Sequence, residues 1–312
     1  MLIKISEELL DNKAELEKFL HYIAMKGRSH SICTENLNKI LKSTSKQPEI
    51  SEIIRCLVEK QLNNIEFINT IEVTVTDNSG GKLTTNDLDE YLSKYPLVIV
   101  ENEINDLKFI KTILYATGNR KILDTFGKLW DISSIGGCGQ IPELLERKIE
   151  TKTPPCRIFV LHDSDKYYPQ DNLNKTHVNI INKCMSLGVS FHTLKRREAE
   201  NYITDEIVLD RNKKNPDFCE AWMKLTEAQK SHYDFKYGFS NKKHDHKDYN
   251  GLFSRITIEM QKSLQNGFGK DISNDVYIQE NYFYYENAKL IAWSMNAMHE
   301  FNKISNKIKG IL

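Results

Sequence analysis

The chain has 312 residues, with 43 Lys and Arg against 43 Asp and Glu, so its formal net charge at pH 7 is zero. A content of 40% hydrophobic and 10% aromatic residues excludes a disordered protein, and the length suffices for one large domain or two modest ones. The zero net charge gives no overall electrostatic reason to expect nucleic-acid binding. Any such function must come from local groups of charged residues.

Residues 1–94 are predicted to form an α-rich accessory region with a β-hairpin. Leu9, Leu16 and Ile23 recur at helical spacing, and a second helical pattern follows Pro48. Residues 65–76 then alternate with β-branched side chains and lead into the turn signal at 78–81, which predicts the hairpin. We interpret this region as a docking or dimerising accessory.

Residues 95–205 carry the pattern of an α/β domain. A short continuous apolar strand is expected at 96–100, and further strands are expected at a segment ending near Ile135, at 157–161 and at 189–194, with helical segments between them. Strands alternating with helices imply right-handed crossovers and a Rossmann-like parallel sheet with helices on both faces. Residues 206–312 are predicted to form an α-helical carboxy-terminal region.

Cysteine usage and the amino terminus indicate the cellular compartment. None of the six cysteines stands in a Cys-x-x-Cys pair with histidines nearby, so neither structural zinc nor a disulfide framework is expected. The amino terminus has no apolar signal segment, and the longest apolar runs are strand-sized. We therefore expect a cytoplasmic protein that does not contact a membrane.

Acidic residues follow three of the four predicted strands. Glu101 follows the first strand, Gly136 and Gly137 follow the second, and Asp163 and Asp165 follow the third. The fourth strand runs into Lys195, Arg196, Arg197, Glu198, Ala199 and Glu200. Because ligands of open parallel sheets bind outside the carboxyl ends of the strands, these residues are predicted to meet at one edge.

Several carboxylates at one edge repel each other unless cations neutralise them. Hard oxygen ligands select Mg²⁺ or Mn²⁺, and we expect one or two such ions here. Other interpretations of single residues remain open. Glu101 could cap the following helix, and Glu198 and Glu200 could pair with the adjacent Arg196 and Arg197.

Two segments carry a family resemblance. The first strand with Glu101, then Gly136-Gly137, then the third strand with Asp163-Ser164-Asp165, resemble the TOPRIM domain shared by topoisomerases, primases and OLD-family nucleases. The segment 194–203, which contains Arg197-Glu198-Ala199-Glu200-Asn201-Tyr202, resembles the "REIENY" stretch of OLD-like proteins. This second match favours the nuclease branch, and the resemblance covers about residues 95–205.

The sequence departs from the family pattern after the first strand. Asn102 stands where a glycine is common, and Asn105 stands at the second acidic position, with Asp106 one residue later. Whether Asn105 or Asp106 faces a metal is left open. A catalytically weak member of the family is therefore an alternative.

The resemblance implies metal-dependent hydrolysis of nucleic-acid phosphodiester bonds. Asp163 and Asp165 would hold the ions, Glu101 would be a ligand or general acid/base, and Lys166 would face the phosphate. The candidate catalytic residues are thus Glu101, Asp163, Asp165 and Lys166, and the candidate metal ligands are Glu101, Asn105, Asp106, Asp163, Asp165, Glu198 and Glu200.

Substrate contacts are predicted on three segments. Gly136 and Gly137 would let the substrate backbone approach the sheet closely. Cations to meet the phosphates are expected at Lys195, Arg196, Arg197, Lys242 and Lys243. The substrate, DNA or RNA, is left open.

No P-loop is present, because Gly81-Lys82 lacks the upstream glycine spacing and a following Ser or Thr. TOPRIM regions of OLD-like proteins are often fused to an ABC-type ATPase, so the resemblance implies a separate ATPase or sensor subunit, in a bacterial anti-phage defence system. Self-association into a homo-oligomer is left open.

Two other functions compete: a TOPRIM-like subunit that binds nucleic acid or a partner without cleavage, and primase-like nucleotidyl transfer. A phosphatase with Asp163 as nucleophile is less favoured. In such enzymes the Asp pair follows the first strand, whereas Asp163 and Asp165 follow the third strand of this segment.

Overall fold

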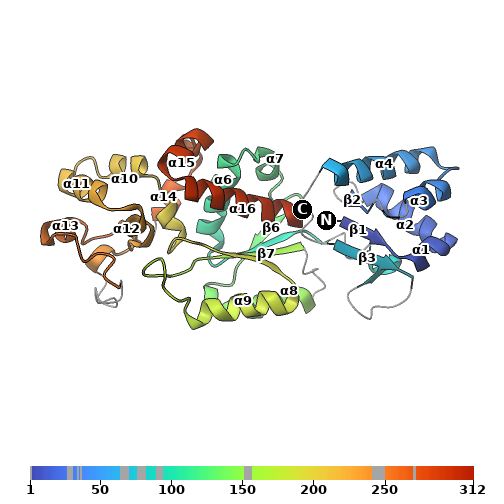
Figure 1. Ribbon diagram of the computed structural model, residues 1–312, viewed down its shortest axis with the longest axis horizontal. Coiled ribbons are helices and arrows are strands. Elements are labelled where there is room, and N and C mark those ends of the chain that lie inside the picture. Colours follow the sequence, from blue (N-terminus) through green and yellow to red (C-terminus); the bar gives the residue numbers. More distant parts are fainter. Residues whose placement is uncertain are drawn as a thin grey trace.

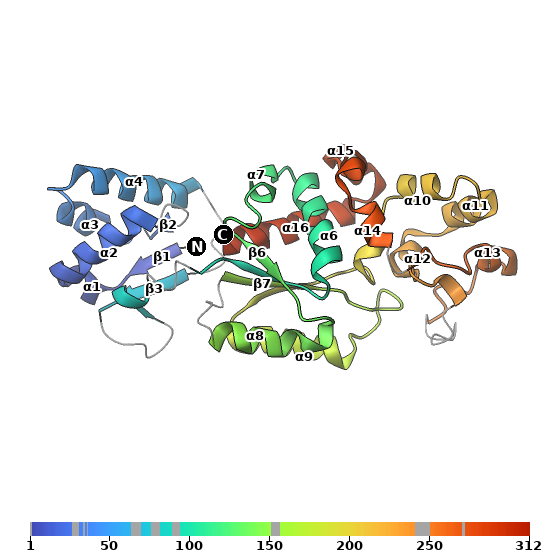
Figure 2. The same cartoon turned by 180° about the vertical axis from the view of Figure 1, so that it is seen from behind.

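The computed structural model describes residues 2–26, 31–33, 35, 37–63, 70–75, 82–88, 94–150, 157–240, 250–269 and 272–312. Its elements lie along one long axis, with an amino-terminal α/β unit at one end, a central sheet, and a group of short helices at the other end (Figures 1 and 2). None of the helices in the described ranges combines the length and the apolar character needed to cross a membrane.

The amino-terminal unit is built on a parallel sheet. Its strands are β1 (Leu2–Ile5), β2 (Ser31–Ile32), β3 (Thr70–Thr74) and β4 (Leu83–Thr84), in the order β2-β1-β3-β4. Helices α1 (Glu7–Asp11), α2 (Lys13–Lys26), α3 (Leu37–Ser43) and α4 (Pro48–Asn63) pack with this sheet around a core of its own that includes Ile3, Phe19 and Val73.

The predicted β-hairpin is wrong. Val73 and Thr74 pair with Leu83 and Thr84 in parallel, and β3 pairs in parallel with β1 as well. The first strand was missed because its alternating pattern spans only four residues, of which Ile3 and Ile5 are buried, and a helical pattern follows at once. The turn signal at 78–81 lies outside the described residues.

The central sheet confirms the predicted α/β class and parallel strands. Strands β5 (Leu97–Ile99), β6 (Asp131–Ser133), β7 (Ile158–His162) and β8 (Ser190–Thr193) pair in parallel in the order β6-β5-β7-β8. All four correspond to the strands expected from sequence. The two central strands, β5 and β7, are buried throughout, as expected for strands covered on both faces, whereas the edge strands β6 and β8 carry polar residues and are only partly buried.

Helices cover both faces of this sheet, as predicted. Helices α6 (Glu103–Ala116) and α16 (Met295–Ile311) lie on one face, and α8 (Ile141–Glu150) and α9 (Lys175–Leu187) lie on the other (Figures 1 and 2). Val98 and Phe159 point into the core shared with α6 and α16, whereas Ile99 and Val160 point into the core shared with α8 and α9. Successive strand residues therefore bury opposite faces.

The elements described between residues 206 and 312 are helical, as predicted. They are α10 (Asp205–Arg211), α11 (Pro216–Lys224), α12 (Glu227–His232), α13 (Ile258–Ser263), α14 (Ile272–Val276), α15 (Asn287–Trp293) and α16, with 3-10 turns at Gly238–Ser240 and Gln279–Tyr285. Their core is continuous with that of the sheet: the rings of Phe109, Tyr202 and Phe301 lie 5.4 to 5.7 Å apart. Packing thus continues across the boundary predicted at residue 205.

Glu300 joins the last helix to the end of β8. Its carboxylate is 2% exposed and accepts hydrogen bonds from the Tyr202 hydroxyl at 2.5 Å and from the Lys195 backbone N–H at 2.8 Å. His192 Nε2 lies 2.8 Å from the same carboxylate. Burial and the charge of Glu300 raise the pKa of Tyr202 well above its usual value, so the hydroxyl keeps the proton that it donates. This contact fixes the segment that follows β8.

Replacing Glu300 by Ala should destabilise the protein strongly. The Tyr202 hydroxyl and the Lys195 N–H would lose their acceptor inside the core, which costs about 3 kcal/mol or more of unfolding free energy. Equilibrium urea unfolding measures this loss, with Glu206→Ala, an exposed change in α10, as the control. A Glu300→Ala variant as stable as the control would show that the contact does not hold the helix to the sheet.

Candidate active site

Strand order determines where the site lies. The chain leaves β5 for β6 on one side of it and then returns to β7 on its other side, so the connections diverge at the carboxyl ends of β5 and β7. Such a switch point is where open α/β sheets bind ligands. Glu101 follows β5, and Asp163 and Asp165 follow β7, so the predicted carboxylates flank this point.

Asp163 lies at the centre of the acidic group. Its Oδ1 accepts a hydrogen bond from the Ala199 backbone N–H at 3.0 Å, which ties the end of β7 to the turn η4 (Ala199–Tyr202). Burial, and then the charges of Glu200 and Asp106, raise the pKa of Asp163 well above its usual value. Carboxylates from separate strand ends are therefore close enough to repel one another, as the sequence predicted.

Asp165 has an unusual backbone conformation. Its φ is 53°, in the left-handed region that Asp tolerates better than most residues, and its N–H donates to the Arg197 carbonyl at 3.0 Å. His177 Nε2 lies 2.9 Å from its Oδ2. Burial pushes the pKa of Asp165 upward, but the hydrogen bond with His177 and the charges of Arg197 and Lys236 hold it below its usual value. Asp165 is therefore ionised over the neutral range.

Asp106, on the first turns of α6, completes the group next to Glu101. Burial, and then the charges of Glu101 and Glu200, raise the pKa of Asp106 to about 7, against the hydrogen bond that the Asn102 N–H donates to its Oδ2 at 2.8 Å. Burial, and then Asp165, raise the pKa of Glu101. These interactions place the Asp106 carboxylate among the acidic side chains.

The two asparagines have other contacts. Asn102 Oδ1 accepts hydrogen bonds from the backbone N–H groups of Ile104 and Asn105, both at 3.1 Å, so the residue that departs from the family glycine is the N-cap of α6. This bond engages the main chain of Asn105, and a role of its side chain in metal binding remains a prediction. Asn102, rather than Glu101, caps the helix.

Lys236 is a member of the site that the sequence analysis missed. Its Nζ lies 2.9 Å from Glu198 Oε2 and 3.6 Å from Glu200 Oε1. Burial lowers the pKa of Lys236, but the charges of Glu198 and Glu200 outweigh burial and raise it. Glu200 also accepts a hydrogen bond from the Ser273 hydroxyl at 2.9 Å. Both glutamates thus have a cation nearby, and their role as metal ligands remains a prediction.

The two arginines after β8 lie inside the protein, which corrects the expectation that both are available to phosphate. Arg196, 6% exposed, donates to the Asn201 carbonyl at 2.7 Å and packs on the Trp293 ring at 4.6 Å. Arg197, 5% exposed, lies 3.2 Å from Glu198 Oε1, so the alternative of pairing with a glutamate holds for this residue. Buried guanidinium groups keep internal partners because an unpaired charge is costly there.

The lysines differ in their surroundings. Lys166 is half-buried directly after Asp165, and burial followed by the charges of Arg196, Arg197 and Lys166 lowers the pKa of His232. Lys195 is exposed and, with Ser231 and His232, lines a pocket of about 360 Å³. Lys242 and Lys243 lie outside the described residues.

A second pocket opens beside Asp165. It has a volume of about 470 Å³ and is lined by Asp165, Tyr167, Asp171, Asn172, Asn174 and Arg197.

Gly136 and Gly137, at the end of β6, have φ values of 82° and 113°, and a Cβ on either would meet no atom within 4 Å. The Gly137 N–H donates to the Glu101 carbonyl at 3.3 Å. The glycines are thus required by the turn and leave open space next to Glu101.

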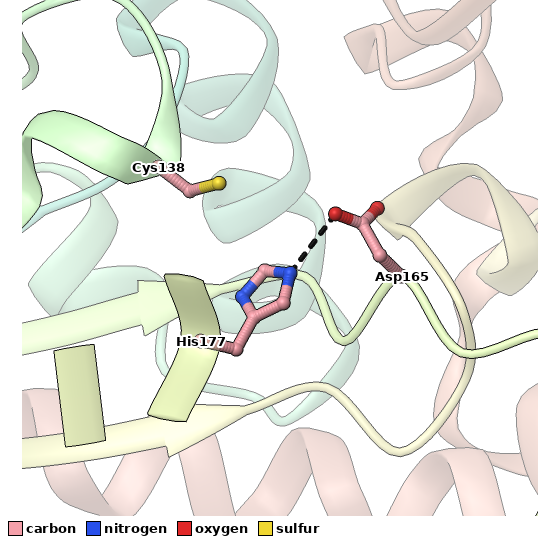
Figure 3. A group of neighbouring side chains, drawn as sticks. All are labelled: Cys138, Asp165 and His177. Atoms are coloured by element: carbon pink, nitrogen blue, oxygen red, sulfur yellow. Dashed lines mark hydrogen bonds and ion pairs between the residues drawn. The ribbon is translucent and has the colours of Figure 1, made fainter. Parts of the chain in front are cut away.

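The donor atoms fit a divalent cation of the magnesium type. Glu101, Asp106 and Asp163 offer carboxylate oxygens whose raised pKa values reflect burial and uncompensated charge, which a cation would relieve. Within the described ranges, the one group of three potential ligands whose atoms all lie within 4.8 Å of each other is Cys138, Asp165 and His177 (Figure 3). Mg²⁺ needs no such trio of protein ligands, because it usually takes one or two carboxylates together with water and phosphate oxygens.

Comparisons with protein-family models, with curated proteins and with solved structures found no match to this chain. The TOPRIM resemblance therefore rests on the motifs at 97–101, 136–137, 160–165 and 194–203.

Asp106→Asn should stabilise the protein in a pH-dependent manner. The folded pKa of about 7 exceeds the ordinary 3.8, so the native state binds more protons than the unfolded state between these values, and stability falls as pH rises. The amide still accepts the hydrogen bond from Asn102. We expect Asp106→Asn to gain up to about 4 kcal/mol of unfolding free energy over the wild type at pH 8, and this gain to vanish near pH 4. Equilibrium unfolding at several pH values measures the gain, with the exposed Glu103→Gln as the control. A loss of stability at pH 8 would contradict the prediction.

Proposed function

We propose that this protein is a metal-dependent nuclease that hydrolyses phosphodiester bonds of nucleic acid. The observation that carries the proposal is the gathering of Glu101, Asp106, Asp163 and Asp165 at the switch point of a parallel sheet, where burial and mutual repulsion raise the pKa values of the first three. Keeping like charges together is unfavourable unless a cation compensates them, and a cation bound there can in turn accept an anionic substrate. The motif resemblance to TOPRIM nucleases supports the same chemistry.

In this proposal Asp163, Asp165 and Glu101 hold one or two Mg²⁺ or Mn²⁺ ions. Such an ion, when bound, neutralises phosphate oxygens and activates water for attack. Glu101, whose pKa burial raises, is suited to take a proton from water and return one to the leaving oxygen. The half-buried Lys166 and the exposed Lys195 supply positive charge to the phosphates, and His177 fixes the Asp165 carboxylate.

The Asp165 pocket supports a polymeric substrate over a small phosphate ester. Its wall contains the carboxylate of Asp165, the buried guanidinium of Arg197 and the side chain of Tyr167, and the Arg197 charge lies over the Tyr167 ring at 4.9 Å. An aromatic ring beside a metal-binding edge suits a stacked base, and Arg197, which is paired with Glu198, positions that ring. Control by a separate ATPase or sensor subunit, with a role in anti-phage defence, is part of the proposal through the family resemblance alone.

Asp163→Asn and Asp165→Asn should each lower nuclease activity at least about 100-fold, because each removes a charge that holds the ion. The assay incubates purified protein with labelled DNA and RNA in Mn²⁺ or Mg²⁺. Asp131→Asn is the matched control, since Asp131 is exposed at the opposite, amino-terminal end of β6, in register with Leu97. The control should retain activity.

The same assay separates the competing functions. Equal cleavage by the wild type and both Asp variants would remove this site as the source of activity. Incorporation of labelled nucleotide without cleavage would favour primase-like transfer. Metal-dependent binding of nucleic acid without either reaction would favour the non-cleaving subunit.

A further inference from the structure

Three ligand atoms of different chemical types meet beside the acidic group. Cys138 comes from the 3-10 turn η2 (Cys138–Gln140), Asp165 from the loop after β7, and His177 from α9. Their ligand atoms all lie within 4.8 Å of one another, and the side chains point toward a common space (Figure 3). The spacing of 138, 165 and 177 matches no short metal-binding motif, which is why the sequence did not predict zinc.

Local structure fixes each member of this trio. Gly137, with a φ of 113°, turns the chain from β6 into η2 and so sets the direction of Cys138. Asn174 caps α9 by accepting from the His177 N–H at 3.2 Å, and the His177 side chain is fully buried. Asp165, whose side chain is 42% exposed, borders the pocket and leaves the trio a path to solvent. The group is therefore accessible to an ion.

A second histidine orients the His177 ring. His162 Nδ1 lies 2.8 Å from the Asp163 carbonyl, to which it can only donate, and 3.1 Å from His177 Nδ1. Because His162 Nδ1 carries a proton, the facing Nδ1 of His177 is the nitrogen without one. His177 therefore carries its proton on Nε2 and donates it to Asp165. The Thr193 hydroxyl, 3.0 Å from His162 Nε2, can donate or accept. These hydrogen-bonded side chains can change tautomer so that His177 Nε2 binds a metal while His177 Nδ1–H donates to His162. His162 then loses its bond to the Asp163 carbonyl.

These contacts disfavour a nucleophilic thiol at Cys138. Both nitrogens of His177 are engaged, by Asp165 and His162, so neither is directed to the sulfur as a base. Burial, and then the charges of Glu101 and Asp165, raise the pKa of Cys138 to about 12. A thiol held among carboxylates is a poor nucleophile, and it becomes a ligand when a thiolate-binding cation displaces its proton.

We propose that Cys138, Asp165 and His177 form a binding site for Zn²⁺, with water as the fourth ligand. A thiolate, an imidazole and one carboxylate select zinc over magnesium, and three protein ligands with one open position are the usual number for an accessible zinc site. Binding releases the thiol proton of Cys138. Because Asp165 belongs to both ligand sets, zinc also takes it from Mg²⁺ or Mn²⁺ and inhibits cleavage; this second part rests on the proposed function.

Cobalt(II) tests the binding directly, because it replaces Zn²⁺ and reports sulfur ligation by a charge-transfer band in the near ultraviolet. The wild type should show that band together with the intense visible bands of four-coordinate cobalt, and one equivalent of Zn²⁺ should abolish both. Cys138→Ser should lose the charge-transfer band. The matched control Cys219→Ser should keep it, since Cys219 lies on α11 with its Sγ 3.3 Å from the Asn212 carbonyl.

Melting temperatures of the metal-free variants show whether each is folded, and Zn²⁺ should raise that of the wild type and of Cys219→Ser but not that of Cys138→Ser. Absence of the cobalt band from the wild type, or its persistence in folded Cys138→Ser, would overturn the site. If Cys138→Ser does not fold, Asp165→Asn serves instead, and an unchanged cobalt spectrum and zinc affinity in that variant would overturn it.

The inhibition is tested by adding Zn²⁺ to the nuclease assay in Mg²⁺, with each variant compared with its own activity in Mg²⁺ alone. Zinc should suppress the wild type and Cys219→Ser, and far less Cys138→Ser. Equal suppression of all three would overturn the inhibition while leaving the binding result intact. A cobalt band in a protein that cleaves no substrate in any metal would contradict the proposed function and support the zinc site.

Discussion

The parallel sheet holds carboxylates together against their own repulsion, and the other features of the site depend on this constraint. β5 and β7 are neighbours in the sheet, so the residues that follow them, Glu101 and Asp163, cannot separate without breaking strand pairing. Burial removes the water that would screen them, which is why their pKa values rise. Lys236 offsets part of this charge through Glu198 and Glu200.

A site that keeps like charges close weakens the fold around it, and the rest of the structure compensates. The last helix covers one face of the sheet, and its buried Glu300 fixes the segment after β8 through Tyr202 and the Lys195 N–H. That segment in turn supplies the Arg197 carbonyl, which accepts from Ser164 and Asp165 and holds the left-handed turn in place. The motif at 194–203 therefore supports the site as well as contributing charge to it.

The sequence predicted the sheet, both covering layers and the acidic edge, because apolar strands followed by carboxylates are local signals. It failed where pairing over distance decides the outcome. Nothing near β3 and β4 indicated that they run parallel. Nothing around Lys236 in the sequence indicated that it pairs with Glu198. The run of charged residues that contains Arg196 gave no sign that this side chain is buried. Cys138 and His177 looked like ordinary turn and helix residues until the fold brought them beside Asp165.

In the proposed function, this edge of the sheet binds a divalent cation through its carboxylates. Anomalous scattering from a crystal soaked in Mn²⁺ tests it most directly, because it locates the ion without reference to activity. We expect a manganese peak within bonding distance of Asp163 and of Glu101 or Asp165. A well-ordered edge without such a peak, with Lys236 still bound to Glu198 and Glu200, would contradict it.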